Sequence, residues 1–208
     1  MIPAASDPSM AALRDVLEDA RRLGLLGPDP VERHMAHALT WAASLEPQRF
    51  LDLGSGAGLP GLVLAHSWPG TFGTLLDSQL RRTAWLRTAI VRLNLTDRIT
   101  VVEGRAEDLG HDPELRERFP LVVARAFGPP PTTAECAAAF VCPGGTVSVS
   151  EPPDAPDRWP IEPLRGIGLG IPRQVVHDGV SFVILPKDST LGSEFPRRRN
   201  RLNRDPLW

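Results

Sequence analysis

The 208-residue chain is poor in cysteine and has no long apolar run. Cys136 and Cys142 are its only cysteines, too few for a disulfide framework or a metal site of their own, and we interpret both as reduced small hydrophobes. No stretch reaches the roughly 18 uncharged apolar residues of a spanning helix. The N-terminus also lacks the basic-then-apolar order of a secretory signal. We therefore expect a cytoplasmic protein with no membrane anchor and no metal.

Lysine is nearly absent as well. Lys187 is the only one, so arginine carries almost all of the positive charge, and its forked guanidinium is suited to phosphate. The net charge of −2 and pI near 6.2 give no general attraction to polyanions and count against a uniformly basic nucleic-acid binder. Basic charge gathers only at the C-terminal end, in Arg197, Arg198, Arg199, Arg201 and Arg204.

Helical spacing of apolar residues predicts two helices before residue 49, and the first ten residues are expected to be frayed. The first helix follows Leu13, Val16, Leu17, Ala20 and Leu23 and is closed by residues 24–28. The second begins at Asp29, with Pro30 in the first helical position, and runs to about Leu45. We interpret residues 1–48 as a small helical N-terminal extension.

From residue 49, short apolar runs alternate with helical segments, which is typical of βαβ units and a parallel sheet. The predicted strands are Phe50 to Leu53, Thr71 to Leu76, Ile99 to Glu103, Leu121 to Ala124, Thr146 to Val149, Arg173 to Val176 and Val180 to Leu185. Only three residues separate the last two, so these must form an antiparallel hairpin. Ser78 is the predicted N-cap of the helix between the second and third strands.

These elements predict an α/β fold with a mostly parallel seven-stranded sheet that ends in the antiparallel hairpin. This domain would span residues 49–188, and residues 189–208 would form a basic C-terminal tail.

A glycine-rich turn connects the first predicted strand to a helix, in the sequence LDLGSGAGLPG at residues 51–61. Glycines let the backbone turn tightly and approach a ligand, and Pro60 suits the start of the helix. The alternative, that the glycines only form a turn, fits the strand-to-helix context less well. The pattern predicts a nucleotide-binding loop.

Two ligand classes compete for this loop. Gly56, Gly58 and Gly61 match the dinucleotide fingerprint, and Asp77 lies 19 residues after Gly58, where an acid that binds the NAD ribose belongs. Asp52, Gly54, Gly56 and Gly58 also fit Asp-x-Gly-x-Gly-x-Gly, motif I of class I methyltransferases. The terminal hairpin is typical of a methyltransferase sheet, so we favour S-adenosylmethionine over NAD.

Four motifs in order resemble the GidB/RsmG family of bacterial small-subunit rRNA guanine-N7 methyltransferases. They are residues 52–61, residues 75–78 with Arg81 and Arg82, residues 104–107, and residues 124–127. The resemblance covers about Phe50 to Leu185. It implies the Rossmann-like fold of class I methyltransferases, S-adenosylmethionine as cofactor, and 16S rRNA or the small ribosomal subunit as partner.

The resemblance also implies roles for the matching residues. Asp52 would lie near the methionine end of the cofactor, and Asp77, with Ser78 beside it, would hold the ribose. Gly54, Gly56, Gly58 and Leu59 would contact the cofactor from the loop, and Ala106 and Glu107 would flank the adenine. Arg125 would lie at the mouth of the active site as the catalytic candidate. Arg197 and Arg198 would contact RNA.

For two of these residues, the sequence also allows a role other than ligand binding. Glu107 could be a solvated loop acid. Arg125 follows a buried run at the carboxyl end of a central strand, where open α/β sheets bind ligands, so we favour a ligand role for it over a structural one.

The predicted reaction needs no general base, because guanine N7 carries an exposed lone pair. The five histidines are scattered along the chain, and we interpret them as surface or capping residues. Ala36 to Ala38 stand where family members carry an acidic-serine pair, and the tail lacks the family's glycine. Because these regions face the substrate, two alternatives stay open: a small-molecule methyltransferase and a non-catalytic S-adenosylmethionine-binding protein.

Overall fold

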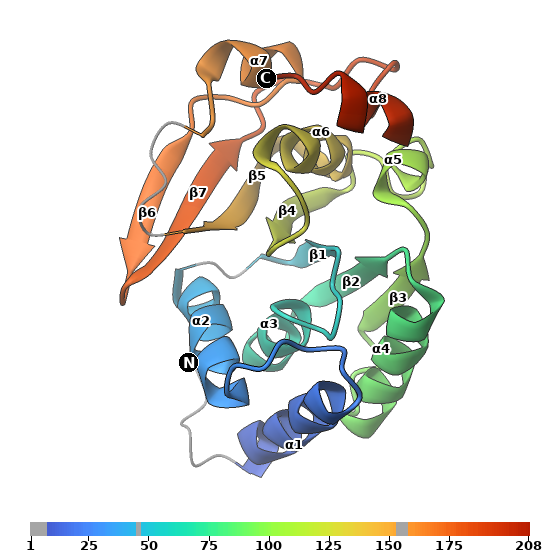
Figure 1. Cartoon of the computed structure of the whole chain (residues 1–208), viewed down its shortest axis with the longest axis vertical. Helices are drawn as coiled ribbons and strands as arrows, with labels where there is room; N and C mark the ends of the chain where they lie inside the picture. The colour runs from blue at the N-terminus through green and yellow to red at the C-terminus, as the bar shows by residue number, and fades with distance from the viewer. Residues whose placement is uncertain (1–7, 45–46, 153–157) are drawn as a thin grey trace. The chain divides into compact units, whose positions relative to one another are not determined.

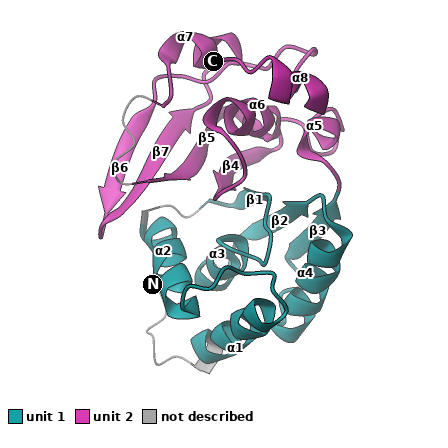
Figure 2. Ribbon diagram, in the orientation of Figure 1, with its two compact units in different colours: residues 1–103 teal, residues 104–208 magenta. Residues whose placement is uncertain are grey.

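The computed structural model of the chain describes residues 8–44, 47–152 and 158–208. The chain divides into two compact units, residues 1–103 and residues 104–208, coloured separately in Figure 2. This boundary falls inside the predicted domain of residues 49–188, so the division into 1–48, 49–188 and 189–208 stays a prediction.

Unit 1 builds three parallel strands with helices between them (Figure 1). Its elements are α1 (Pro8–Arg22), α2 (Val31–Ser44), β1 (Arg49–Leu53), α3 (Gly61–Ser67), β2 (Phe72–Asp77), α4 (Leu80–Arg92) and β3 (Ile99–Glu103). The strands pair in the order β3-β2-β1, with Leu51 opposite Thr74 and Leu75 opposite Val101. All three strands therefore end at one edge of this part of the sheet.

The N-terminal helices belong to the core of unit 1. α1 contacts α2, α3 and α4, and α2 packs on α3. Leu13 and Leu17 of α1 and Trp41 of α2 are among the most deeply buried side chains, and Asp19 pairs with Arg92 of α4 at 2.9 Å. The two N-terminal helices thus pack on α3 and α4, the helices that contact the strands.

Two helix starts differ from the predictions. α1 already begins at Pro8, so fraying of residues 8–10 is wrong, and the prediction for residues 1–7 lies outside the described residues. α2 begins at Val31 because the Pro30 carbonyl accepts its first bond, from Arg33 N–H at 3.1 Å. The predicted end at Leu45 is also outside the described residues.

The predicted cap of α4 is wrong as well. The N-cap is Gln79, whose backbone N–H donates to Asp77 Oδ1 at 2.9 Å. Ser78 lies one residue before this N-cap, and it is exposed.

Unit 2 joins a parallel pair of strands to an antiparallel hairpin. Its elements are α5 (Ala106–Leu109), β4 (Phe119–Ala124), α6 (Pro130–Phe140), β5 (Val141–Glu151), α7 (Ile161–Gly166), β6 (Arg173–His177), β7 (Val180–Pro186) and α8 (Arg199–Arg204). The strand order is β4-β5-β7-β6, with β4 and β5 parallel and the other pairs antiparallel. The prediction of a terminal hairpin is confirmed, and its turn uses Asp178 and Gly179 at positive φ.

β5 is much longer than the predicted Thr146 to Val149. Pro143, Gly144 and Gly145 read as strand breakers, but a register shift in the pairing with β4 absorbs them. At its other end β5 pairs with β7 as far as Glu151. The strand therefore carries Glu151 to the carboxyl edge of the β4–β5 pair.

Candidate functional site

The glycine-rich turn of unit 1 is folded back onto the end of β2. The N–H groups of Gly54 and Ser55 both donate to the Leu76 carbonyl at 2.9 Å. Gly54, Gly56 and Gly58 have φ of +75°, +57° and +105°, a region that only glycine enters easily. The loop conformation thus requires glycine at the three positions that the motif predicted.

The three glycines differ in what surrounds them. Gly54 and Gly56 are partly exposed, and a Cβ on Gly56 would meet nothing nearer than the Gly54 carbonyl oxygen at 3.9 Å. Gly58 is buried, and a Cβ there would lie 2.3 Å from Leu62 Cδ1. Gly54 and Gly56 therefore offer open backbone to a ligand, whereas Gly58 allows α3 to pack. Leu59, next in the chain, is also buried.

Asp52 anchors the helix that follows the loop. Its side chain is fully buried, and Oδ2 accepts the Gly61 N–H at 2.9 Å, in the first turn of α3. A Cβ on Gly61 would lie 2.5 Å from that oxygen, which explains the glycine that ends the motif. The structure thus gives Asp52 a positioning contact, and its predicted place near a cofactor stays a prediction.

Asp77 ties the loop to the end of β2. Oδ2 accepts the Gly56 N–H at 2.9 Å, while Oδ1 accepts the N–H of Gln79. Arg82 approaches the same carboxylate at 3.6 Å. The structure therefore brings together the acid and the glycines that sequence spacing had paired, and each carboxylate oxygen keeps a second lone pair.

Sequence reasoning missed one exposed residue beside this acid. Leu80, at the start of α4, is 67% exposed although it is large and apolar. It follows the exposed Ser78 and Gln79, so a flat apolar ligand group bound at this edge could cover it. The signal in the sequence was an apolar residue outside the buried stripe of the helix.

Ala106 and Glu107 begin α5 of unit 2, and both are buried. Glu107 is 8% exposed and lies 3.4 Å from Arg105, so the reading of Glu107 as a solvated acid is wrong. Burial is the main cause that raises the pKa of the Cys136 thiol, and the negative charges of Glu107 and Glu135 raise it further. Cys136 therefore stays a neutral, unreactive thiol, and both cysteines are free.

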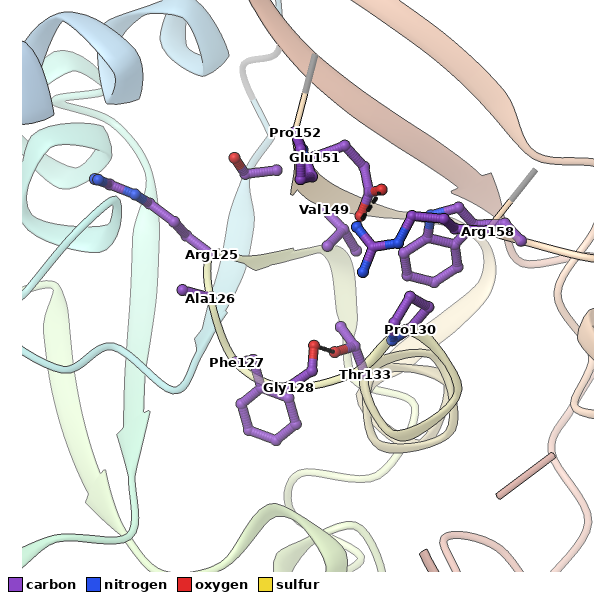
Figure 3. Close-up of a pocket in the computed structure, with 12 residues that line it drawn as sticks. Arg125, Ala126, Phe127, Gly128, Pro130, Thr133, Val149, Glu151, Pro152 and Arg158 are labelled. Atoms are coloured by element: carbon purple, nitrogen blue, oxygen red, sulfur yellow. Dashed lines mark hydrogen bonds and ion pairs between the residues drawn. The ribbon is translucent and has the colours of Figure 1, made fainter. Parts of the chain in front are cut away.

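Arg125 directly follows β4 and is half-buried. It lines a cavity of about 340 Å³ at the carboxyl ends of β4 and β5. Figure 3 shows its side chain extending away from a second charged group of the cavity, the ion pair of Glu151 with Arg158 at 2.8 Å. Sequence reasoning placed Arg125 at such an edge but missed the pair, whose two residues lie seven positions apart in the chain.

The C-terminal tail is held by an ion pair between Arg197 and Glu135. The Arg197 guanidinium donates to both carboxylate oxygens of Glu135, with Nη2 2.8 Å from Oε2 and Nε 3.0 Å from Oε1. The Arg197 side chain is only 15% exposed and is engaged by Glu135, so the structure gives it a structural contact and its RNA contact stays a prediction. The exposed basic residues of this end are Arg198, Arg199, Arg201 and Arg204.

Other candidate sites are scarce in the described parts of the chain. Within residues 8–44, 47–152 and 158–208, no helix has the length and apolar character to cross a membrane. The same residues contain no group of three or more His, Cys, Asp or Glu placed to hold a metal. His34, interpreted as a surface or capping residue, is buried in α2.

Solved structures match most of the chain at low sequence identity. An O-methyltransferase from Bacillus cereus, in complex with S-adenosylhomocysteine, aligns with a TM-score of 0.59 and 19% identity over 84% of this chain and 90% of that one. The O-methyltransferase TomG from Streptomyces achromogenes, in complex with S-adenosylmethionine, gives 0.58 and 16% over 91% and 92%. These likenesses confirm the class I methyltransferase fold.

Curated relatives are closer in sequence. A family model described as rRNA small subunit methyltransferase G, GidB, matches residues 27–150. The ribosomal RNA small subunit methyltransferase G of Prochlorococcus marinus is 46% identical over 100 residues, or 48% of this chain and 40% of that protein. The one from Acidothermus cellulolyticus is 39% identical over 129 residues, or 60% and 55%.

The chain thus spans about half the length of these two relatives. A third, from a Thermoanaerobacter species, is 33% identical over 174 residues, which cover 78% of this chain and 70% of that protein. With a family model over residues 27–150 and this long alignment, the chain belongs to the rRNA small subunit methyltransferase G family.

Proposed function

We propose that the chain is an S-adenosylmethionine-dependent methyltransferase whose acceptor is N7 of a guanine in 16S rRNA. The observation that carries the proposal is the contact between Asp77 and Gly56, which sets an acid beside a partly exposed glycine turn at the carboxyl edge of parallel strands. Ligands of open α/β sheets bind at this edge. The family supports the same chemistry.

The loop of unit 1 fits an adenosylated cofactor. Open space around Gly56 admits a ligand close to the backbone, and Asp77 has lone pairs for ribose hydroxyls beside Ser78. Leu80 supplies exposed apolar surface for the base. Asp52 and Gly58 act indirectly here, by holding the first turn of α3 and its packing. Ala106 and Glu107 of unit 2 would flank the adenine.

S-adenosylmethionine, when bound, supplies an electrophilic methyl group on a sulfonium. Guanine N7 needs no deprotonation before methylation, so the protein's residues have to orient the base and exclude water rather than remove a proton. Arg125, at the end of β4, is the candidate to hold the acceptor or its phosphate. Exposed Arg198 and its neighbours on α8 would contact the RNA backbone.

The test is methyl transfer from labelled S-adenosylmethionine to small ribosomal subunits that lack the modification. We expect label in 16S rRNA, recovered as 7-methylguanosine after digestion, and none in subunits that already carry it. Label in another nucleoside would contradict the guanine-N7 assignment.

A small-molecule acceptor is the second candidate. The pI near 6.2 and the structural role of Arg197 favour it, because both reduce the basic surface available to RNA. Label that appears in a metabolite extract but not in subunits or free RNA would establish this alternative. Binding of S-adenosylhomocysteine without transfer to any of the three would indicate a non-catalytic binding protein.

A further inference from the structure

The cavity beside Arg125 has the size and position of an acceptor site. β4 and β5 run parallel, with Ala124 opposite Val149, so the residues that follow them meet at one edge. The cavity of about 340 Å³ at this edge is lined by Phe127 and Thr133 as well as Glu151, Arg158 and Trp159 (Figure 3). This volume lies within the usual range for small-molecule sites, roughly 300–1,000 Å³.

Glu151 gives the cavity a hydrogen-bond acceptor. Its side chain is 5% exposed, and Oε2 accepts Arg158 Nη1 at 2.8 Å. Burial of a carboxylate is unfavourable unless it is paired, and Arg158 supplies that partner in the wall of the cavity. The remaining lone pairs of the carboxylate can accept N–H groups of a ligand.

Trp159 gives the same cavity a donor. The residue is 8% exposed, and its indole Nε1 finds no hydrogen-bond partner in the described parts of the chain. An indole N–H can only donate. A buried donor without an acceptor is costly, and a ligand oxygen would remove that cost. Arg158 has further N–H groups beside the same carboxylate.

We propose that this cavity binds the Watson–Crick edge of the acceptor guanine, an inference that rests on the proposed function. The guanine N1–H and N2–H groups donate to the Glu151 carboxylate, and O6 accepts from Trp159 or Arg158. N7 lies on the Hoogsteen edge of the base, so this binding mode leaves N7 accessible to methylation. The guanine must be unstacked to enter, as in recognition of single-stranded RNA.

The arrangement also predicts discrimination among bases. Adenine would turn its N1 lone pair toward the carboxylate, and cytosine would do the same with N3. Neither base could donate to Glu151 from that atom, so the carboxylate would lose a hydrogen bond. Inosine keeps N1–H and O6 but lacks the N2 amino group, and it therefore loses one hydrogen bond to Glu151. A preference for guanine over inosine is thus the specific signature of this carboxylate.

The first experiment compares nucleotide monophosphates with the full chain saturated with S-adenosylhomocysteine. We expect guanosine monophosphate to bind about ten times more tightly than inosine monophosphate, and adenosine monophosphate to bind more weakly still. Glu151→Gln should remove most of the preference for guanosine over inosine. Equal binding of guanosine and inosine monophosphates by the unaltered protein overturns the proposal without reference to any variant.

The second experiment measures methyl transfer to small ribosomal subunits. Glu151→Gln should lower kcat/KM about ten- to a hundredfold and leave the affinity for S-adenosylhomocysteine unchanged. Glu162→Gln is the matched control, because that side chain is 85% exposed and its ion pair is with Arg165 on α7. Equal rates for the two variants would overturn the acceptor role of Glu151.

The two experiments separate the failure of this inference from the failure of the proposed function. Subunits that are not methylated, together with a Glu151-dependent preference for guanosine monophosphate, would contradict the rRNA substrate but support the pocket. Methylated subunits without that preference would support the substrate and overturn the pocket. Trp159→Phe removes only the indole donor, and it should weaken guanosine and inosine monophosphate binding equally, because both carry O6.

Discussion

Arg197 and Glu135, 62 positions apart in the chain, form a forked ion pair that fastens the C-terminal tail to α6. The Arg197 backbone N–H also donates to Glu135 Oε1, and this carboxylate raises the pKa of the Arg197 guanidinium. Arg116 holds the same tail by donating to the carbonyls of Phe195 and Leu191. The end of the chain is thus anchored to unit 2.

We predict that Glu135→Gln lowers the free energy of unfolding by about 3 kcal/mol, because it leaves the largely buried Arg197 without its counter-charge. Urea unfolding measures the change. Glu162→Gln, an exposed substitution, should stay within about 0.5 kcal/mol of the unaltered protein. Equal stability of the two variants would show that the Glu135 contact contributes nothing.

The exposed arginines near α8 should behave differently from Arg197. If the proposed RNA contacts are correct, Arg198→Ala with Arg201→Ala will reduce the salt slope of RNA binding by roughly 1.5–2, with little change in stability. Filter binding at several salt concentrations gives the slope. An unchanged slope would leave these residues as solvated charge.

The two glycines of the loop can separate packing from ligand binding. Gly58→Ala should destabilise the fold by more than about 2 kcal/mol, since its Cβ would lie 2.3 Å from Leu62 at a φ of +105°. Gly56→Ala has open space and should lower stability by only about 1 kcal/mol, yet weaken S-adenosylhomocysteine binding. Thermal unfolding and calorimetry check the pair. Similar losses of stability would contradict the difference in packing.

Lys187, the only lysine, predicts a pH dependence of stability. Its Nζ is buried, donates to the Ala138 carbonyl at 2.9 Å and lies 3.4 Å from Glu117. Burial lowers its pKa below the ordinary 10.5, although Glu117 opposes the shift. The unfolded chain therefore binds more protons in the interval between the lowered pKa and 10.5, and stability should rise with pH there.

Urea unfolding between pH 7 and pH 10 tests this sign. The contribution of Lys187 should increase by at most about 1.4 kcal/mol per pH unit and should vanish in Lys187→Met. A contribution that falls as the pH rises would mean that Glu117, rather than burial, dominates the pKa of Lys187.

Local signals explain why much of the fold could be predicted. Buried strands such as β4 are short apolar runs, and the short connection between β6 and β7 permits only a hairpin. The glycine loop and Asp77 could also be predicted, because the turn needs glycine at fixed positions and the acid ends the next strand. Each of these features depends on neighbours in sequence or on a fixed spacing.

The features that were missed depend on tertiary contacts. The sequence shows Arg197 only as part of a basic run, and nothing local indicates that Glu135 neutralises it. Glu151 and Arg158 pair although they lie seven positions apart, and the length of β5 follows from its partners rather than from its own proline and glycines. The Ser78 cap was wrong because the helix begins one residue later, after Gln79, whose N–H donates to the side chain of Asp77.

Calorimetry of the full chain with S-adenosylhomocysteine tests the central claim most directly, with a nicotinamide dinucleotide as the competing ligand. We expect saturable binding of S-adenosylhomocysteine, at least tenfold weaker in Asp77→Asn because the ribose acid and its contact with Gly56 are altered. We expect no binding of the dinucleotide. Binding of the dinucleotide with no heat from S-adenosylhomocysteine would contradict the claim.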